Sequence, residues 1–436
     1  MELSLTPRQR RFAALAALLG NALEWYDFAV YGYVASALGQ AFFPAEVPAL
    51  QTMASFGVFA VGYLMRPVGS LVLGPLGDLL GRRLMLSLSI VIMGISSLAI
   101  GLLPTHAQIG MTAGILLVLL RMLQGFSVGG EFTGSITYAT EAASRGHGGF
   151  LSSLATAGGL VGFSLGSLTA AVIGWTVGQE AMVAWGWRLP FLLGALVAVM
   201  GLWMRRSMPE TLPPDEDGPA LNNLSDLGGA VLWRLQQVAQ QWRLVLRVIG
   251  LVSFANVVFY LAFVFLVDHT GMTLGNSAAA NTVATVMQTI GLPLVVLGGH
   301  LADRRGLVTV NRWGNLILLL VMPAGLLIGQ QGTLTALALA LAVMLLPLMA
   351  TMGAQGVLGV VMVPLRQRCA VFSIGYSLAM ALFAGTAPLM ATWLLQRQHW
   401  PWGTPLYALG YGLIALWAVQ ASKPLLRGSE GTDQAP

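Results

Sequence analysis

Long apolar runs, separated by short polar breaks, restrict this chain to one class of fold. Of its 436 residues, 56% are hydrophobic and only 9% are charged, whereas a soluble domain has roughly 25% charged residues. A helix needs about 20 apolar residues to cross the roughly 30 Å hydrocarbon core of a bilayer, and backbone groups in lipid must bond within their own segment. Because the alternation of a membrane β-barrel is absent, the sequence predicts an all-α membrane protein.

The apolar runs predict twelve membrane-spanning helices in two groups of six. The first six are expected at residues 12–37, 50–76, 84–103, 111–140, 150–174 and 185–206, and the second six at 244–268, 278–301, 308–329, 333–362, 370–395 and 403–422. Between the groups, a Pro-rich acidic stretch and then a basic segment predict a cytoplasmic linker with an amphipathic helix. The expected domains are therefore an N-terminal half at 1–206, the linker at 207–243, a C-terminal half at 244–422 and a cytoplasmic tail at 423–436.

A short loop pattern occurs twice. Gly74-Pro-Leu-Gly-Asp78-Leu-Leu-Gly81-Arg82-Arg83 returns as Gly299-His-Leu-Ala-Asp303-Arg304-Arg305-Gly306, and the three shared Gly, Asp and Gly positions are each 225 residues apart. Each copy lies between two long apolar runs. The repeat indicates two equivalent membrane halves, which is the usual build of secondary transporters.

The distribution of basic residues predicts the orientation. Of 22 Lys and Arg residues, 18 fall in the amino terminus, the loops that join even to odd spans, the linker with its flanks, and the tail. The positive-inside rule places these segments and both termini in the cytoplasm. The net charge of +5 follows from this asymmetry and does not indicate a nucleic-acid partner. We expect no cleavable signal, because basic residues lead directly into a full-length first span, and the one cysteine excludes an intrachain disulfide.

The few ionisable residues inside the spans are the candidate functional groups, because each costs at least a few kcal/mol at the bilayer centre. Glu24 and Asp27 lie in the first expected span, Arg66 in the second, and Arg121 and Glu131 in the fourth. Helical spacing places the two carboxyl groups of the first span on one arc, and Glu131 on the same arc of the fourth span as Gln124. Two carboxyl-bearing faces can therefore look into a common interior.

A carboxyl group buried among apolar residues can take up and release a proton near neutral pH. The proton-coupling candidates are Asp27, Glu131 and Glu24. The alternative is a charge-neutral structural network in which Glu24 or Glu131 pairs with Arg66 or Arg121. We favour the proton role for Asp27 and Glu131 and the structural role for Glu24 and Arg66.

The second half has no ionisable residue at mid-membrane and offers uncharged polar groups instead. We expect the substrate to bind Tyr31, Arg121 and Gln124 of the first half and Tyr260, Gln288 and Tyr376 of the second. An intramembrane guanidinium can clamp a substrate carboxylate through two parallel hydrogen bonds. For the uncharged residues, the alternative is an ordinary interhelical hydrogen bond.

Glycine and proline positions predict packing and bending. Gly158, Gly162 and Gly166 form a small-residue stripe that indicates close helix packing. Gly385 and Pro388 predict a break or kink in the eleventh span.

Four ordered blocks resemble one family. They are Gly20-Asn-Ala-Leu-Glu24-Trp-Tyr-Asp27-Phe-Ala-Val-Tyr31-Gly, Arg66-Pro67-Val-Gly69, Arg121-Met-Leu-Gln124-Gly125-Phe-Ser-Val-Gly-Gly-Glu131 and Gly186-Trp-Arg188-Leu-Pro190-Phe191. Together they resemble the metabolite:proton symporter family of the major facilitator superfamily, and look closest to its proline/betaine transporters. The resemblance implies a bundle of six plus six helices, a central cavity and alternating access.

The resemblance also implies a cytoplasmic gate formed by the loop motifs, with the residues Gly74, Asp78, Gly81, Arg82, Arg83, Glu141, Arg145, Asp303 and Arg304. In this role Asp78 caps a helix of the opposite half, and a carboxylate at a helix N-terminus is favourable. The alternative is a pair of static turns, because glycine suits any tight turn. The second copy lacks the Arg pair after Gly306, so we expect a weaker latch there, with Arg304, Arg305 and Arg368 as substitutes.

These observations predict a proton-coupled symporter that imports a small polar metabolite across a bacterial inner membrane. The expected substrate is a zwitterion such as proline or a betaine, or a small organic acid. The expected partners are this small molecule, protons and membrane lipid, with no nucleic acid, no cofactor beyond the coupling proton, and a monomeric chain. No phosphate-binding loop, zinc spacing or catalytic triad indicates an enzyme. Two alternatives are a proton-coupled efflux antiporter and a non-transporting membrane receptor or scaffold.

Overall fold

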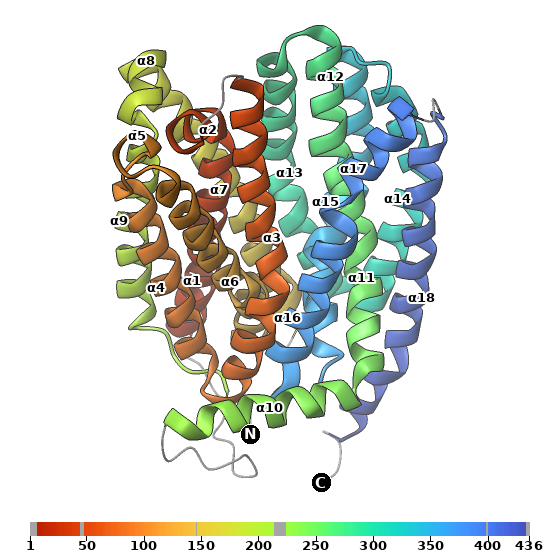
Figure 1. The fold of residues 1–436 in the computed structure, drawn as a ribbon. Helices are drawn as coiled ribbons and strands as arrows, with labels where there is room; N and C mark the ends of the chain where they lie inside the picture. Colours follow the sequence, from red (N-terminus) through yellow and green to blue (C-terminus); the bar gives the residue numbers. More distant parts are fainter. Residues whose placement is uncertain (1–6, 44–47, 145, 213–223, 398–399, 433–436) are drawn as a thin grey trace. The chain divides into compact units, whose positions relative to one another are not determined.

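The computed structural model describes residues 7–43, 48–144, 146–212, 224–397 and 400–432, and every regular element within these ranges is helical (Figure 1). The elements up to the predicted linker are α1 (Pro7–Tyr33), α2 (Ala35–Phe42), α3 (Pro48–Leu79), α4 (Arg82–Leu102), α5 (His106–Ile109), α6 (Met111–Ala142), α7 (Gly148–Val177), α8 (Gln179–Ala181), η1 (Met182–Gly186) and α9 (Arg188–Arg205). Within the predicted linker lies α10 (Leu224–Gln240), which contains Arg234 but not Arg243 or Arg247, so the basic character expected of the linker helix is not present in it.

The remaining elements are α11 (Trp242–Tyr260), η2 (Leu261–Phe265), α12 (Leu266–Leu274), α13 (Ser277–Arg305), α14 (Leu307–Gly329), α15 (Leu334–Val361), η3 (Leu365–Gln367), α16 (Arg368–Ala379), η4 (Met380–Ala384), α17 (Ala387–Thr392), η5 (Trp393–Arg397) and α18 (Gly403–Thr432). Among the described residues, ten helical stretches are long and apolar enough to cross a membrane by length and composition. The other two expected spans correspond to α1, with 27 residues, and α18, with 30.

The helices form two compact units. One unit comprises residues 1–138 and 158–235, and the other comprises residues 139–157 and 236–436. In the first unit α9 packs against α4 and α1, and in the second α15 packs against both α13 and α14 while α11 packs against α16 and α18. The end of α6 and the start of α7 therefore belong to the second unit, although chain order places them among the first six spans.

The glycine stripe of α7 lies directly against α1. A Cβ atom added at Gly158 or Gly162 would collide with the carbonyl oxygen of Leu18 or Ala22, respectively. Only glycine allows the two backbones to approach this closely. The predicted close packing is thus confirmed. The predicted break in the eleventh span is also present, because α17 begins two residues after Gly385 and carries a proline in its first turn.

Buried charge is concentrated in one unit. Among the described side chains, the charged ones classed as buried are Glu24, Asp27, Arg66, Asp78, Arg82, Arg121, Glu131, Arg205 and Arg234, and all belong to the first unit. The described interior of the second unit buries amides and hydroxyls instead. The buried charges among the described residues therefore belong to the first unit, while their depth in the membrane stays a prediction.

The α7–α1 contact can be tested with two matched substitutions. Gly162→Ala places a methyl group against the α1 backbone, whereas Gly174→Ala on the same helix meets nothing within 4 Å. Both changes raise helix propensity by about 1 kcal/mol, but overpacking costs about 1 to 3 kcal/mol. We expect Gly162→Ala to lower the melting temperature of the purified protein and Gly174→Ala to leave it unchanged or raise it. Equal melting temperatures for the two variants would contradict the close contact.

Candidate functional site

The three predicted proton-coupling carboxyl groups line one small cavity in the first unit. Glu24 and Asp27 reach it from α1 and Glu131 reaches it from α6, and its other lining residues are Gly20, Leu23, Ser89, Ile90, Met93, Gly194 and Ala198. Its volume is about 10 Å³, which is about the volume that one water molecule requires. The arrangement expected from helical spacing is therefore present, because α1 and α6 turn their carboxyl-bearing faces toward each other.

A chain of hydrogen bonds connects Asp27 with Arg121. The Arg121 Nη1 group donates to Gln124 Oε1 over 2.7 Å, and Gln124 Nε2 donates to Ser97 Oγ over 2.8 Å. Ser97 Oγ in turn donates to Asp27 Oδ2 over 2.7 Å. All four side chains are buried, with exposed fractions of 2% or less. Every donor points from the guanidinium toward the carboxylate, so the chain stabilises a negative charge on Asp27 and a positive charge on Arg121.

The rest of the Arg121 guanidinium lies among aromatic rings. Its Cζ atom is 4.2 Å from the ring centroid of Tyr31 and 4.7 Å from that of Phe28, both on α1. Its Nε and Nη2 groups, which share one edge of the guanidinium, have no hydrogen-bond partner among the described residues. That edge has the two-donor geometry that matches a carboxylate. Three predicted substrate residues, Tyr31, Arg121 and Gln124, thus lie together.

Glu131 forms an ion pair with a residue that the sequence interpretation did not consider. The Arg205 guanidinium of α9 contacts both carboxylate oxygens of Glu131, with Nη1 and Oε2 3.1 Å apart, and donates to the carbonyl oxygen of Leu86. Both partners are buried, at 3% and 1% exposure. The sequence interpretation considered Arg66 or Arg121 as the partner. Arg205 adjoins Arg206 at the end of a span, so it had the appearance of an ordinary cytoplasmic flank.

Glu24 and Arg66 are buried without this kind of close pairing. Neither carboxylate oxygen of Glu24 has a hydrogen-bond partner among the described residues. The Arg66 guanidinium lies over the rings of Trp25 and Tyr63, at 5.2 and 5.5 Å from their centroids. Its charge is therefore stabilised by aromatic faces.

The predicted substrate residues of the second unit are more dispersed. The Tyr376 hydroxyl on α16 donates to Asn256 Oδ1 on α11 over 3.4 Å, and both residues are buried. Tyr260 is half-buried at the end of α11, where its ring packs against Phe259, and Gln288 is half-buried on α13. Within this unit, the structure brings Tyr376 and Asn256 together.

Both copies of the loop motif have the same backbone geometry. Gly81 precedes α4 with a φ of 99°, and Gly306 precedes α14 with a φ of 92°. Side chains with a Cβ rarely adopt this region, so each glycine allows the sharp reversal between two helices. The equivalence that the 225-residue repeat predicted is therefore present in the backbone.

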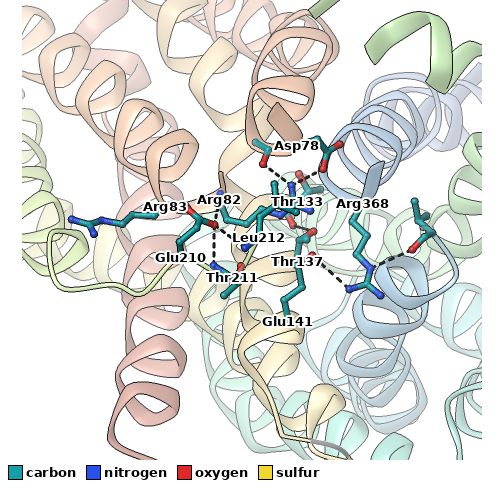
Figure 2. A network of polar contacts seen from close by, with 12 residues as sticks. Asp78, Arg82, Arg83, Thr133, Thr137, Glu141, Glu210, Thr211, Leu212 and Arg368 are labelled. Atoms are coloured by element: carbon teal, nitrogen blue, oxygen red, sulfur yellow. Dashed lines mark hydrogen bonds and ion pairs between the residues drawn. The ribbon is translucent and has the colours of Figure 1, made fainter. Parts of the chain in front are cut away.

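Around the first copy, a half-buried carboxylate, that of Glu210, caps a helix. Asp78 and Arg82 form an ion pair with a 2.5 Å N–O distance. Glu210, which follows α9, accepts hydrogen bonds from the backbone N–H groups of Arg82 and Arg83 over 2.9 and 3.1 Å (Figure 2). The sequence interpretation missed Glu210 because it lies in the acidic stretch assigned to the linker.

Around the second copy, Asp303 caps a different helix. Its two carboxylate oxygens accept hydrogen bonds from the backbone N–H groups of Gly149 and Phe150 at the start of α7, each over 2.7 Å. A Cβ added at Gly299 would collide with the Gly149 carbonyl oxygen, so this motif glycine permits close contact of α13 with α7. The helix-capping role that the resemblance implied for Asp78 thus occurs at Asp303.

The other gate candidates are placed as follows. Glu141 at the end of α6 lies 3.6 Å from Arg368 at the start of α16 (Figure 2). Gly74 is buried in α3, Arg304 is exposed on α13, and Arg145 lies outside the described residues. Arg368 therefore forms an ion pair with Glu141, and its role as a substitute for the missing Arg pair stays a prediction.

Comparison with known proteins identifies the family. The family model of the Major Facilitator Superfamily matches residues 17–367. The chain belongs to this superfamily. It is 36% identical over 396 residues to a proline/betaine transporter of Salmonella typhimurium, and the matched region covers 89% of this chain and 78% of the relative. It is 32% identical over 446 residues to an ectoine/proline transporter of Corynebacterium glutamicum, which covers 97% of this chain and 86% of the relative.

Solved structures show the same fold. A proton:xylose symporter of the superfamily superposes with a TM-score of 0.71 at 17% identity, over 95% of both chains. The predicted fold, with twelve membrane helices in two six-helix halves, is therefore confirmed. The resemblance to proline/betaine transporters is confirmed as well, and the chain is a multi-pass membrane transporter and not an enzyme.

The Glu210 cap can be tested by hydrogen exchange. Glu210→Gln removes the negative charge that binds the first N–H groups of α4. Losing a cap costs about 0.5 to 2 kcal/mol, so we expect the amides at the start of α4 to exchange about 2 to 30 times faster. Glu180→Gln, a change of an exposed residue on α8, is the matched control. Unchanged exchange in Glu210→Gln would show that the carboxylate does not stabilise this helix end.

Proposed function

We propose that this transporter imports a small metabolite bearing a carboxylate, such as proline or a betaine, together with a proton. The observation that carries the proposal is the chain of hydrogen bonds from Arg121 to Asp27. It connects a guanidinium suited to a carboxylate with a carboxyl group suited to a proton, through Gln124 and Ser97 only. The names of the bacterial relatives, which include proline, betaine and ectoine, support the substrate class.

Charge balance supports coupling in the same direction. With Asp27 ionised, its charge offsets that of Arg121 across the hydrogen-bond chain. A proton on Asp27 removes the acceptor charge at the end of this chain and leaves Arg121 with an unbalanced positive charge in a low-dielectric interior, which is costly. A substrate carboxylate on the unpartnered edge of Arg121 offsets this charge locally, and a zwitterionic substrate gains from it only when its own cationic group lies farther from the guanidinium than its carboxylate does. Proton and carboxylate therefore favour each other's binding, as symport requires.

The remaining carboxyl groups have supporting roles in the proposal. Glu131 and Glu24 line the same cavity as Asp27, so either can exchange a proton with Asp27 through the space between them. Glu131 is held by Arg205, and its release from that ion pair would accompany protonation. We propose that the two loop motifs change partners as access alternates between the two sides of the membrane. The distribution of basic residues supports cytoplasmic termini in a bacterial inner membrane.

An efflux antiporter is the less favoured function. In an antiporter, binding of the proton and binding of the substrate oppose each other. For a carboxylate-bearing substrate at Arg121, the charges described above make the two binding events favour each other, which is the opposite of what an antiporter requires. The symporter proposal therefore predicts that an inward proton gradient drives uptake into proteoliposomes, and outward transport driven by that gradient would contradict it.

Asp27→Asn tests the proton site. The amide keeps the size of the side chain and its ability to accept a hydrogen bond from Ser97, but it cannot ionise. We expect proteoliposomes with this variant to exchange substrate across the membrane but to lose accumulation driven by a pH gradient. Glu180→Gln should accumulate substrate as the unaltered protein does. Accumulation retained in Asp27→Asn would rule out this carboxyl group as the coupling site.

Arg121→Lys tests the carboxylate site. Lysine retains the charge but lacks the planar two-donor edge. Because hydrogen bonds to charged groups contribute about 1.5 to 3 kcal/mol, we expect affinity for a carboxylate substrate, measured by calorimetry, to fall about 10- to 100-fold. Arg188→Lys, a change of a residue that donates to the carbonyl oxygens of Gly101 and Leu103, is the control. The same affinity in both variants would place the carboxylate elsewhere.

A further inference from the structure

Three aromatic rings surround the Arg121 guanidinium in a way that fits a different cation. Besides Tyr31 and Phe28 on α1, the ring of Phe59 on α3 lies 5.4 Å from the guanidinium carbon. A cation within about 6 Å of a ring centroid is attracted by the negative face of the ring. The guanidinium is therefore the resident cation of a three-ring site.

The rings are positioned by one another as well as by the arginine. Phe28 and Phe59 have centroids 5.4 Å apart, and Tyr31 and Phe59 lie 6.0 Å apart with an interplanar angle of 23°. Phe28 also meets Tyr63 edge to face at 4.7 Å. Phe28 and Tyr31 are three residues apart on α1, and Phe59 and Tyr63 are four apart on α3, so each pair occupies one helix face. The ring faces can thus keep their arrangement if the cation between them changes.

The resident guanidinium has a reason to leave the rings. Arg121 is fully buried, yet only its Nη1 group donates a hydrogen bond to a described residue, and its Nε and Nη2 groups have none. A carboxylate arriving at that edge offers two charge-assisted hydrogen bonds, which are stronger than contact with a ring face. A carboxylate at that edge therefore competes with the rings for the guanidinium, and the inference requires that the guanidinium move toward the carboxylate.

We propose that the faces of Phe28, Tyr31 and Phe59 form the subsite for the quaternary ammonium group of a zwitterionic substrate. This inference rests on the proposed function, because it assumes that Arg121 binds the substrate carboxylate. The substrate then exchanges one cation for another: its carboxylate takes the guanidinium, and its own ammonium group occupies the ring faces.

The polar atoms of the subsite favour a quaternary over a secondary ammonium group. A secondary ammonium has N–H groups that need acceptors when they are buried. The Tyr31 hydroxyl is already engaged, because it donates to the Ser55 carbonyl oxygen over 3.2 Å and accepts from Ser55 Oγ over 3.3 Å. A quaternary ammonium has no N–H group and needs only the ring faces. Phe59 is half-buried, whereas Phe28 and Tyr31 are buried.

The test compares glycine betaine with 3,3-dimethylbutyrate, which has the same shape and the same carboxylate but carbon in place of the charged nitrogen. Calorimetry on the purified protein measures the affinity for each, without a membrane gradient. We expect the unaltered protein to prefer glycine betaine by about tenfold, the order of a desolvated cation–π interaction. Phe59→Leu keeps an apolar side chain but removes the ring face, so we expect most of this preference to be lost.

The control is Phe163→Leu. Phe163 is also half-buried and its ring packs against Trp25 on α1, with centroids 5.2 Å apart. We expect this variant to retain the preference for glycine betaine. If Phe59→Leu does not fold, phenylalanine with one, two and three ring fluorines at position 59 replaces it, and the preference should fall stepwise as the ring face becomes less negative.

Two results would overturn the subsite. One is an unaltered protein that binds glycine betaine and 3,3-dimethylbutyrate equally, and the other is a preference that survives Phe59→Leu or the full fluorine series. Failure of the proposed function looks different. If the proposed function is wrong, Arg121→Lys leaves binding of the substrate intact or a pH gradient drives no uptake. The preference between the two ligands is measured separately from both.

Discussion

Charge neutrality in a low-dielectric interior is the constraint on which the rest of the first unit depends. Three carboxyl groups, Glu24, Asp27 and Glu131, and three guanidinium groups, Arg66, Arg121 and Arg205, are each 3% exposed or less. An unpaired buried charge costs several kcal/mol, so equal numbers of each sign are required if all six are ionised. The groups nevertheless have different surroundings. Glu131 and Arg205 are in direct contact, whereas Asp27 and Arg121 are connected by hydrogen bonds through two neutral side chains. Arg66 lies on aromatic faces. The balance of charge that allows these six residues to be buried is therefore disturbed by one added proton.

Sequence periodicity was sufficient to predict which residues share one face of a helix. The thickness of the bilayer predicts the length of each span, and the helical repeat places Glu24 and Asp27 on one face of α1. That Glu131 of α6 lines the same cavity depends on helix packing. Sequence periodicity was insufficient to predict partners whose positions depend on how helices pack. Arg205 lies at the end of a span beside Arg206, Glu210 lies in an acidic stretch, and Ser97 is one hydroxyl among many in the third expected span. None of the three has a local signal, because each acquires its role from residues more than 60 positions away in the chain.

The two loop motifs show how a repeated sequence can retain its backbone and change its contacts. Gly81 and Gly306 have nearly the same φ and occupy the same position before a helix. The aspartates differ: Asp78 forms an ion pair with Arg82, while Asp303 binds the first N–H groups of α7. A carboxylate at a helix N-terminus is stabilised by unsatisfied N–H groups and by the helix dipole. In the first unit Glu210 performs that task for α4, through the backbone N–H groups of Arg82 and Arg83.

In the proposed mechanism, Arg121 is the residue at which proton and substrate meet. A lysine would carry the same charge, but as a compact, strongly hydrated point charge, and it could not at once bind Gln124, contact the Tyr31 ring and keep a planar two-donor edge available. The planar guanidinium does all three, because its edges form hydrogen bonds while its faces contact the rings. Each event therefore acts on the same group: protonation of Asp27 weakens the hydrogen bonds at one corner, and a carboxylate attracts the opposite edge. The proposed coupling requires no long-range pathway, because Asp27 and Arg121 are connected by only three hydrogen bonds.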